Sequence, residues 1–104
     1  MKIQFNTDHH ITGNEKLRAP LEARISEELS RFSSRVTRLE VHLSDENGDK
    51  DGPDDKRCMI EARLEGVKPI AVTHHANTHE QAVEGALDKL KTSLDTVLGR
   101  LSSL

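Results

Sequence analysis

Histidines are the residues whose type and spacing come nearest to a metal-binding pattern. The chain holds six histidines in 104 residues. Five of them form two groups, His9 with His10, and His74 with His75 and His79. A zinc site usually needs three or four converging ligands, whereas adjacent residues of a strand point to opposite faces. The two groups also belong to strands expected at opposite edges of a sheet, so we predict no metal site.

Nucleophilic groups are equally sparse. Cys58 is the only cysteine, so it cannot form an internal disulfide, and its place among apolar residues predicts a buried, unreactive thiol. No serine lies in a nucleophile-elbow pattern, and the sequence has no glycine-rich phosphate loop. We therefore predict that the protein is not an enzyme and takes no cofactor or small-molecule substrate.

An acidic segment carries all of the excess negative charge. The chain has 15 basic and 18 acidic residues, of which residues 45–57 hold three and six, so the remainder is balanced at twelve of each. Four positions of a calcium-binding EF-hand loop are matched here, by Asn47, Asp49, Asp51 and Gly52. The twelfth position requires a bidentate glutamate but is Cys58, and the flanking residues alternate like strands. We predict a flexible, solvated hairpin loop over 45–56.

Basic residues on two expected helices are the remaining candidates for a binding site. They are Arg18, Arg24, Arg31 and Arg35 in the first helical region and Lys89 and Lys91 in the second. Arginine and lysine bind the phosphates of nucleic acids. The same arginines can instead form a solvated face paired with neighbouring glutamates, and the sequence leaves both interpretations open. With no Trp, no Tyr and two Phe, the chain is unsuited to stacking single-stranded bases.

Alternating and helical patterns predict the elements that must hold these residues. Apolar–polar alternation predicts strands at 2–6, 36–45, 57–65 and 70–75. A first helix is indicated by the stripe Leu17, Leu21, Ile25, Leu29 and Phe32. A second, longer helix follows a capping box that begins at Thr78, and its stripe runs from Ala82 to Leu101. Pro20 interrupts the first stripe, which predicts either a kinked helix or a separate first turn over residues 12–18.

The element order, β-α-β-β-β-α, predicts an α+β fold. A helix joins the first two strands, so they can pair in parallel through a right-handed crossover, and the next two joins are hairpins. Each strand has one apolar and one polar face, so we expect a four-stranded mixed sheet with both helices on one face. The length fits one domain over residues 1–104. The single cysteine, the absence of a long apolar run and the strand-like start without a signal peptide predict a cytoplasmic protein that makes no membrane contact.

Several stretches together resemble one known family. They are the opening strand ending in His9-His10, Leu17-Arg18 with Arg24, RLEVHLS at 38–44, IEARLEG at 60–66, and the AxxxALDKL pattern at 82–90. In these stretches the chain resembles the ribosome hibernation-promoting factors and ribosome-associated translation inhibitors, also known as sigma-54 modulation proteins. The resemblance covers nearly the whole chain and implies a helix–sheet arrangement of the double-stranded-RNA-binding type.

The resemblance implies a non-catalytic protein that occupies the small ribosomal subunit under stress or in stationary phase. Translation would be blocked by steric occlusion, with basic helix residues on rRNA phosphates. On this chain the implied RNA-binding residues are Arg18, Arg24, Arg31, Lys89 and Lys91. Where the family continues with basic residues, this chain has Thr92, Asp95 and Thr96, which predicts weaker and less salt-sensitive binding. The alternative is a diverged member that acts as a protein-interaction module or homodimer through the apolar end of the second helix, formed by Val97, Leu98, Leu101 and Leu104.

Overall fold

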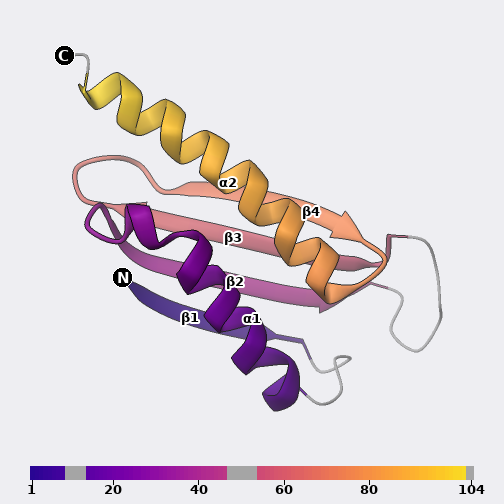
Figure 1. Cartoon of the computed structure of the whole chain (residues 1–104). Helices are drawn as coiled ribbons and strands as arrows, with labels where there is room; N and C mark the ends of the chain where they lie inside the picture. Colours follow the sequence, from indigo (N-terminus) through magenta and orange to yellow (C-terminus); the bar gives the residue numbers. More distant parts are fainter. Residues whose placement is uncertain (9–13, 47–53, 103–104) are drawn as a thin grey trace.

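The computed structural model describes residues 1–8, 14–46 and 54–102. Its elements are β1 (Lys2–Thr7), α1 (Asn14–Glu28), the 3-10 helix η1 (Ser30–Phe32), β2 (Val36–Asp45), β3 (Lys56–Leu64), β4 (Ile70–Ala76) and α2 (His79–Ser102). The strands form one sheet in the order β1-β2-β3-β4, with β1 parallel to β2 and the other pairs antiparallel. Both helices cover the same face of the sheet (Figure 1). The predicted α+β fold is confirmed.

The core lies between the sheet and the two helices. Alternate residues of the central strands point into it, among them Leu39, Val41 and Ile60, none of which exposes any surface. The longer helix α2 contributes six buried side chains, from Ala82, Val83, Ala86, Leu87, Leu90 and Leu94. Within its bounds α1 contributes two, from Leu21 and Ile25. Because burial of apolar surface drives folding, α2 is the main cover of the sheet. No helix in the described ranges is long and apolar enough to cross a membrane.

The first helix contains Pro20 in its interior and is not divided by it. Helix α1 runs without a break from Asn14 to Glu28 with Pro20 inside it, so a separate first turn is wrong. A proline removes one backbone hydrogen bond, here to the carbonyl of Lys16. Both residues are exposed, so water can reach that carbonyl. The helix then tightens into η1, whose Phe32 is buried as the apolar stripe predicted.

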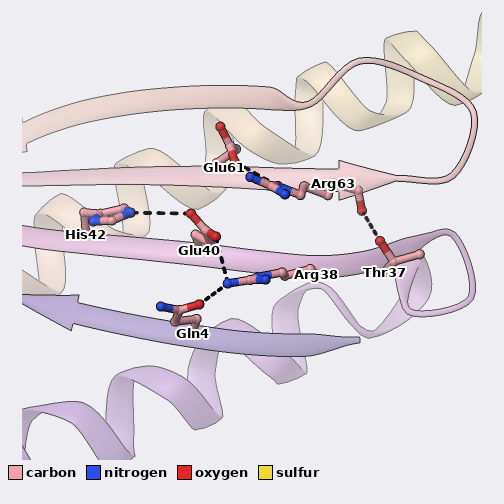
Figure 2. A network of polar contacts seen from close by, with 7 residues as sticks. All are labelled: Gln4, Thr37, Arg38, Glu40, His42, Glu61 and Arg63. Atoms are coloured by element: carbon pink, nitrogen blue, oxygen red, sulfur yellow. Dashed lines mark hydrogen bonds and ion pairs between the residues drawn. The ribbon is translucent and has the colours of Figure 1, made fainter.

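One end of the sheet contains an irregularity that changes which way side chains point. Val36 pairs with Leu64, but the next paired residues are Arg38 and Arg63, so Thr37 is an extra residue in β2. In a regular strand Val36 and Arg38 would share a face, because side chains alternate. The bulge allows Val36 to be buried in the core while Arg38 lies on the face without helices. Figure 2 shows Arg38 and Arg63 on that open face.

The neighbouring histidines of β4 separate as predicted. A Cβ atom built on Gly85 of α2 would lie 2.0 Å from Cδ2 of His74, so the His74 ring packs directly on this glycine. His75 points the other way, is exposed, and its Nε2 lies 3.0 Å from Oε1 of Glu46. The two rings therefore cannot share a ligand. His9 and His10 lie outside the described residues.

Candidate nucleic-acid interface

The five basic residues predicted to bind RNA all lie on the helical side of the molecule. Arg18 and Arg24 belong to α1, Arg31 to η1, and Lys89 and Lys91 to α2. The structure gives every one of them a polar partner within the protein. The paired-face interpretation that the sequence left open is met by Arg18, Arg24 and Arg31, whereas Arg35 has no ion pair among the described residues.

Arg31 joins η1 to the C-terminal half of α2. Its guanidinium donates two hydrogen bonds to the carboxylate of Asp95, at 2.8 and 3.0 Å, and its Cζ lies 4.1 Å from the centre of the Phe32 ring. The hydrogen bonds from Arg31 lower the pKa of Asp95, and they raise the pKa of Arg31 in turn. Asp95 also stands at one of the positions where the resemblance implied a base. Its carboxylate pairs with Arg31, whose guanidinium would otherwise face only solvent.

A second set of charges joins α1 directly to α2. Nζ of Lys91 donates to Oε1 of Glu28 at 2.6 Å, and Arg24 lies 3.6 Å from Glu84. Burial pushes the pKa of Glu28 upward, but hydrogen bonds from Lys91 and Glu84 outweigh it and leave that pKa lowered. Burial and the hydrogen bond to Glu28 raise the pKa of Glu84. Two carboxyl groups thus share one pair of bases across the helix interface.

The other two bases are held more locally. Arg18 lies 3.5 Å from Glu22, one helical turn along α1. Nζ of Lys89 donates to the backbone carbonyl of Thr73 at 2.8 Å, which ties α2 to the edge strand β4. Of the five, Lys89 is the one whose partner among the described residues, a backbone carbonyl, carries no charge, so it can still offer a net positive charge to a phosphate.

The charge of the helical surface is slightly negative. The α1 sequence has three bases and four acids, and the α2 sequence also has three and four, which leaves each helix with a net charge of 3 − 4 = −1. A phosphate that binds Arg18, Arg24, Arg31 or Lys91 must compete with an internal carboxylate. Exposed ion pairs typically contribute about 0 to 1 kcal/mol, so such an exchange is energetically accessible. The arrangement is suited to weak rather than tight anion binding.

Comparison with known proteins identifies the family of this chain. A family model described as "Sigma 54 modulation protein / S30EA ribosomal protein" matches residues 5–102. The chain belongs to this family. Among curated proteins, no individual relative is significantly similar to it.

Solved structures with the same fold agree with that membership. A ribosomal subunit interface protein from Coxiella burnetii has 15% identity and a TM-score of 0.73, and the alignment covers 95% of this chain and 99% of that one. The N-terminal domain of Protein Y from Thermus thermophilus has 18% identity and a TM-score of 0.72, with 93% and 99% covered. At these identities the likeness establishes the fold, and the sigma 54 modulation protein / S30EA fold is the one that the sequence predicted.

Other candidate sites of this family member are explained by the fold. Cys58 is fully buried in β3, and burial raises the pKa of its thiol to about 12, so it is the unreactive core residue that was predicted. Among the described residues, one acidic group converges, with carboxylate oxygens of Glu28, Glu84 and Asp88 within 4.8 Å of one another. Lys91 and Arg24 already lie against two of these carboxylates.

The acidic segment is only partly the loop that was predicted. A flexible loop over 45–56 is wrong at its ends, because Asp45 closes β2 and Lys56 opens β3. Nζ of Lys56 lies 3.0 Å from Asp45 and 3.1 Å from Asp55, both of which are buried. The EF-hand-like residues 47–53 lie outside the described residues.

Proposed function

We propose that this protein binds the small ribosomal subunit in the cytoplasm and keeps idle ribosomes from translating. It would act by occupying space at the subunit interface and would catalyse no reaction. The observation that carries the proposal is the family match over residues 5–102, which is nearly the whole chain. The similar folds of a ribosomal subunit interface protein and of Protein Y support it.

The RNA contacts in this proposal are Arg18, Arg24, Arg31, Lys89 and Lys91 on the helical surface. The four that are paired with acids must exchange an internal carboxylate for an rRNA phosphate, so part of the gain in binding is offset by the pair that is lost. Affinity for nucleic acid falls with salt in proportion to the number of phosphates contacted. Binding is therefore expected to be weaker and less salt-sensitive than in family members whose second helix ends in additional bases.

Co-sedimentation with purified small subunits at several salt concentrations tests both parts. The double variant Arg18→Ala, Lys89→Ala is expected to lose co-sedimentation and to keep its fold, because both side chains are exposed. Glu22→Gln is the matched control, since it removes the acid beside Arg18 without removing a base, and it is expected to strengthen binding. Thr92→Arg with Thr96→Lys should strengthen it further. If wild type stays in the supernatant at every salt concentration, the proposed function is wrong.

The structure offers little surface for the alternative of a homodimer through the apolar end of α2. Leu98 packs against the core, Val97 is half-buried, and Leu101 is 37% exposed. Leu104 lies outside the described residues. A stable dimer normally buries about 800 Å² on each partner, which this short apolar strip cannot supply alone. Ribosome binding is therefore the function that the geometry supports best.

A further inference from the structure

Charges in this protein are separated along the direction of the strands. At one end of the sheet lie the starts of β1 and β2, the end of β3 and the turn into β4 (Figure 1). The bases at this end are Lys2, Arg35, Arg38, Arg63 and Lys68, and we call these five residues the basic end. The acids near them are Glu40, Glu61 and Glu65, so the net charge is 5 − 3 = +2.

The opposite end of the sheet has the reverse balance. Its described acids are Asp8, Asp45, Glu46, Asp54 and Asp55, set against Lys56 and Arg57, for a net charge of 2 − 5 = −3. Both helices begin at this acidic end and finish at the basic end (Figure 1). Helix dipoles favour that polarity, but their influence falls off within the first and last turns. They do not account for bases on the face of the sheet that the helices leave uncovered.

Three of the five bases form one rung across the open face. Lys2 is paired with Arg38 across β1 and β2, and Arg38 is paired with Arg63 across β2 and β3. Like charges placed directly opposite one another on a sheet are destabilising. The Thr37 bulge brings about this arrangement, because it turns Arg38 away from the core and opposite Arg63. Bulges are frequent near functional sites, where they redirect a side chain.

Acids in the next row of paired residues, Glu40 and Glu61, neutralise the charge of this rung only in part. Arg38 lies 2.9 Å from Glu40 and also contacts Gln4, while Arg63 lies 3.2 Å from Glu61 (Figure 2). Lys2, Arg35 and Lys68 are exposed, and none of them has an ion-pair partner among the described residues. The basic end therefore presents three available charges, whereas four of the five helix bases are paired with acids.

We propose that the basic end is a second phosphate-binding surface, which contacts the sugar–phosphate backbone of an RNA strand. The proposal rests on the proposed function in taking RNA as the partner. The rung spans two inter-strand spacings, about 10 Å, so it can contact more than one phosphate. Both phenylalanines, Phe5 and Phe32, are buried in the core, so the surface has no aromatic ring for base stacking. Contacts would be to phosphates and independent of sequence.

Salt titration of RNA binding tests this surface. The probe is a fluorescein-labelled 20-base-pair RNA duplex of arbitrary sequence, followed by anisotropy, alongside co-sedimentation with small subunits. The triple variant Lys2→Ala, Arg35→Ala, Lys68→Ala is expected to make the slope of log affinity against log salt about three units shallower, because each phosphate contact contributes nearly one unit on B-DNA. The single variant Lys68→Ala should lower the slope by about one. Its matched control is Lys16→Ala, an exposed α1 lysine at the acidic end, which should leave the slope unchanged.

Gain of charge provides a second, independent arm. Glu65→Lys adds a base in the turn before β4 and is expected to tighten RNA binding and steepen the slope. If Lys68→Ala and Lys16→Ala behave alike and Glu65→Lys has no effect, the basic end is not an RNA contact. If wild type binds the duplex but never the subunits, the proposed function fails while the duplex data still decide on the basic end. If wild type binds neither, both proposals are wrong.

Discussion

The helix-covered side and the open side of the sheet use the same charged residue types with different results. On the covered side, bases face acids across the junction of two helices, as Arg31 faces Asp95 and Lys91 faces Glu28. On the open side, the strand register places Lys2, Arg38 and Arg63 in a row. Pairs that cross between elements hold the fold together, whereas Lys2, Arg35 and Lys68 at the basic end have no acidic partner among the described residues and remain available to an outside anion. The position of a base in the fold therefore decides its availability to an anion more than the number of bases does.

Substitutions should separate the two sides by their effect on stability. On the covered side they are expected to reduce the free energy of unfolding, because packing and ion pairs are lost there. On the open side they are expected to change binding and leave stability nearly unchanged.

The largest loss is expected for Gly85→Ala, where α2 packs directly on the His74 ring of β4. The new Cβ would overlap the His74 ring, and overpacking typically costs about 1 to 3 kcal/mol. Gly99→Ala is the matched control in the same helix, because no atom lies within 4 Å of its Cβ position. That control should gain up to about 1 kcal/mol from helix propensity. Urea unfolding that gives the same value for both variants would contradict the close packing of His74.

A smaller loss, about 1 to 2 kcal/mol, is expected for Lys91→Ala, which removes a charged hydrogen bond. Glu28 would then face the Glu84 carboxyl without the base between the helices. The lowered pKa of Glu28 means that its stabilising effect exists above its ordinary pKa and is lost as the pH falls through the lowered value. The difference between wild type and Lys91→Ala should therefore shrink in acid. An equal difference at pH 7 and pH 3 would contradict this assignment.

A smaller effect on the free energy of unfolding is expected when His79, at the start of α2, is replaced. Burial, followed by the nearby charge of Lys56, lowers the pKa of this imidazole, although Glu80, Asp45 and Asp8 act in the opposite direction. A lowered pKa means that the folded state favours the neutral ring, so its contribution is present above the ordinary histidine pKa and lost as the pH falls below it. Wild type should lose stability between pH 7.5 and pH 5.5, and His79→Gln should lose less. The variant His75→Gln, on the exposed face of β4, should retain the wild-type loss.

The smallest change in stability is expected for Lys2→Ala on the open side. This variant should alter the free energy of unfolding by less than about 0.5 kcal/mol, in the stabilising direction, because it relieves repulsion with Arg38. Arg31→Ala on the covered side is the comparison, and it should destabilise because Asp95 loses both hydrogen bonds. Equal losses from the two variants, measured by thermal unfolding, would remove the distinction between the sides.

Local patterns in the sequence were sufficient for the fold. The alternation of Leu39, Val41 and Leu43 correctly predicts β2 and its buried face, because a strand repeats every two residues. The strand predicted at 57–65 is found one residue earlier, where Lys56 is held by two aspartates. The separate first turn predicted from Pro20 was wrong, because α1 is continuous. The core side chains Leu21 and Ile25, one and five residues later, favour a continuous helix enough to tolerate the missing hydrogen bond.

The site was predictable by residue type but not by pairing. Arg18 and Glu22 are four residues apart in one helix, so their contact can be predicted from sequence spacing alone. Arg31 and Asp95 are 64 residues apart, and Lys91 and Glu28 are 63 apart, so their contact depends on how two helices pack. The basic end was missed for the same reason, since Lys2, Arg38 and Arg63 meet only through strand register and a bulge. The available signal was the cluster of bases near strand starts and ends.

The parallel pairing of β1 determines which part of the protein should open first. Lys2 and Arg38 are 36 positions apart in sequence, whereas β2, β3 and β4 follow one another through hairpins. Strand β1 is an edge strand that contacts one neighbour, and elements with few buried contacts exchange their amide hydrogens through local opening. Amides of β1 are therefore expected to exchange with deuterium before those of β3. Because Lys2 lies on β1, a molecule in which this strand has opened also lacks one of the three bases of the rung.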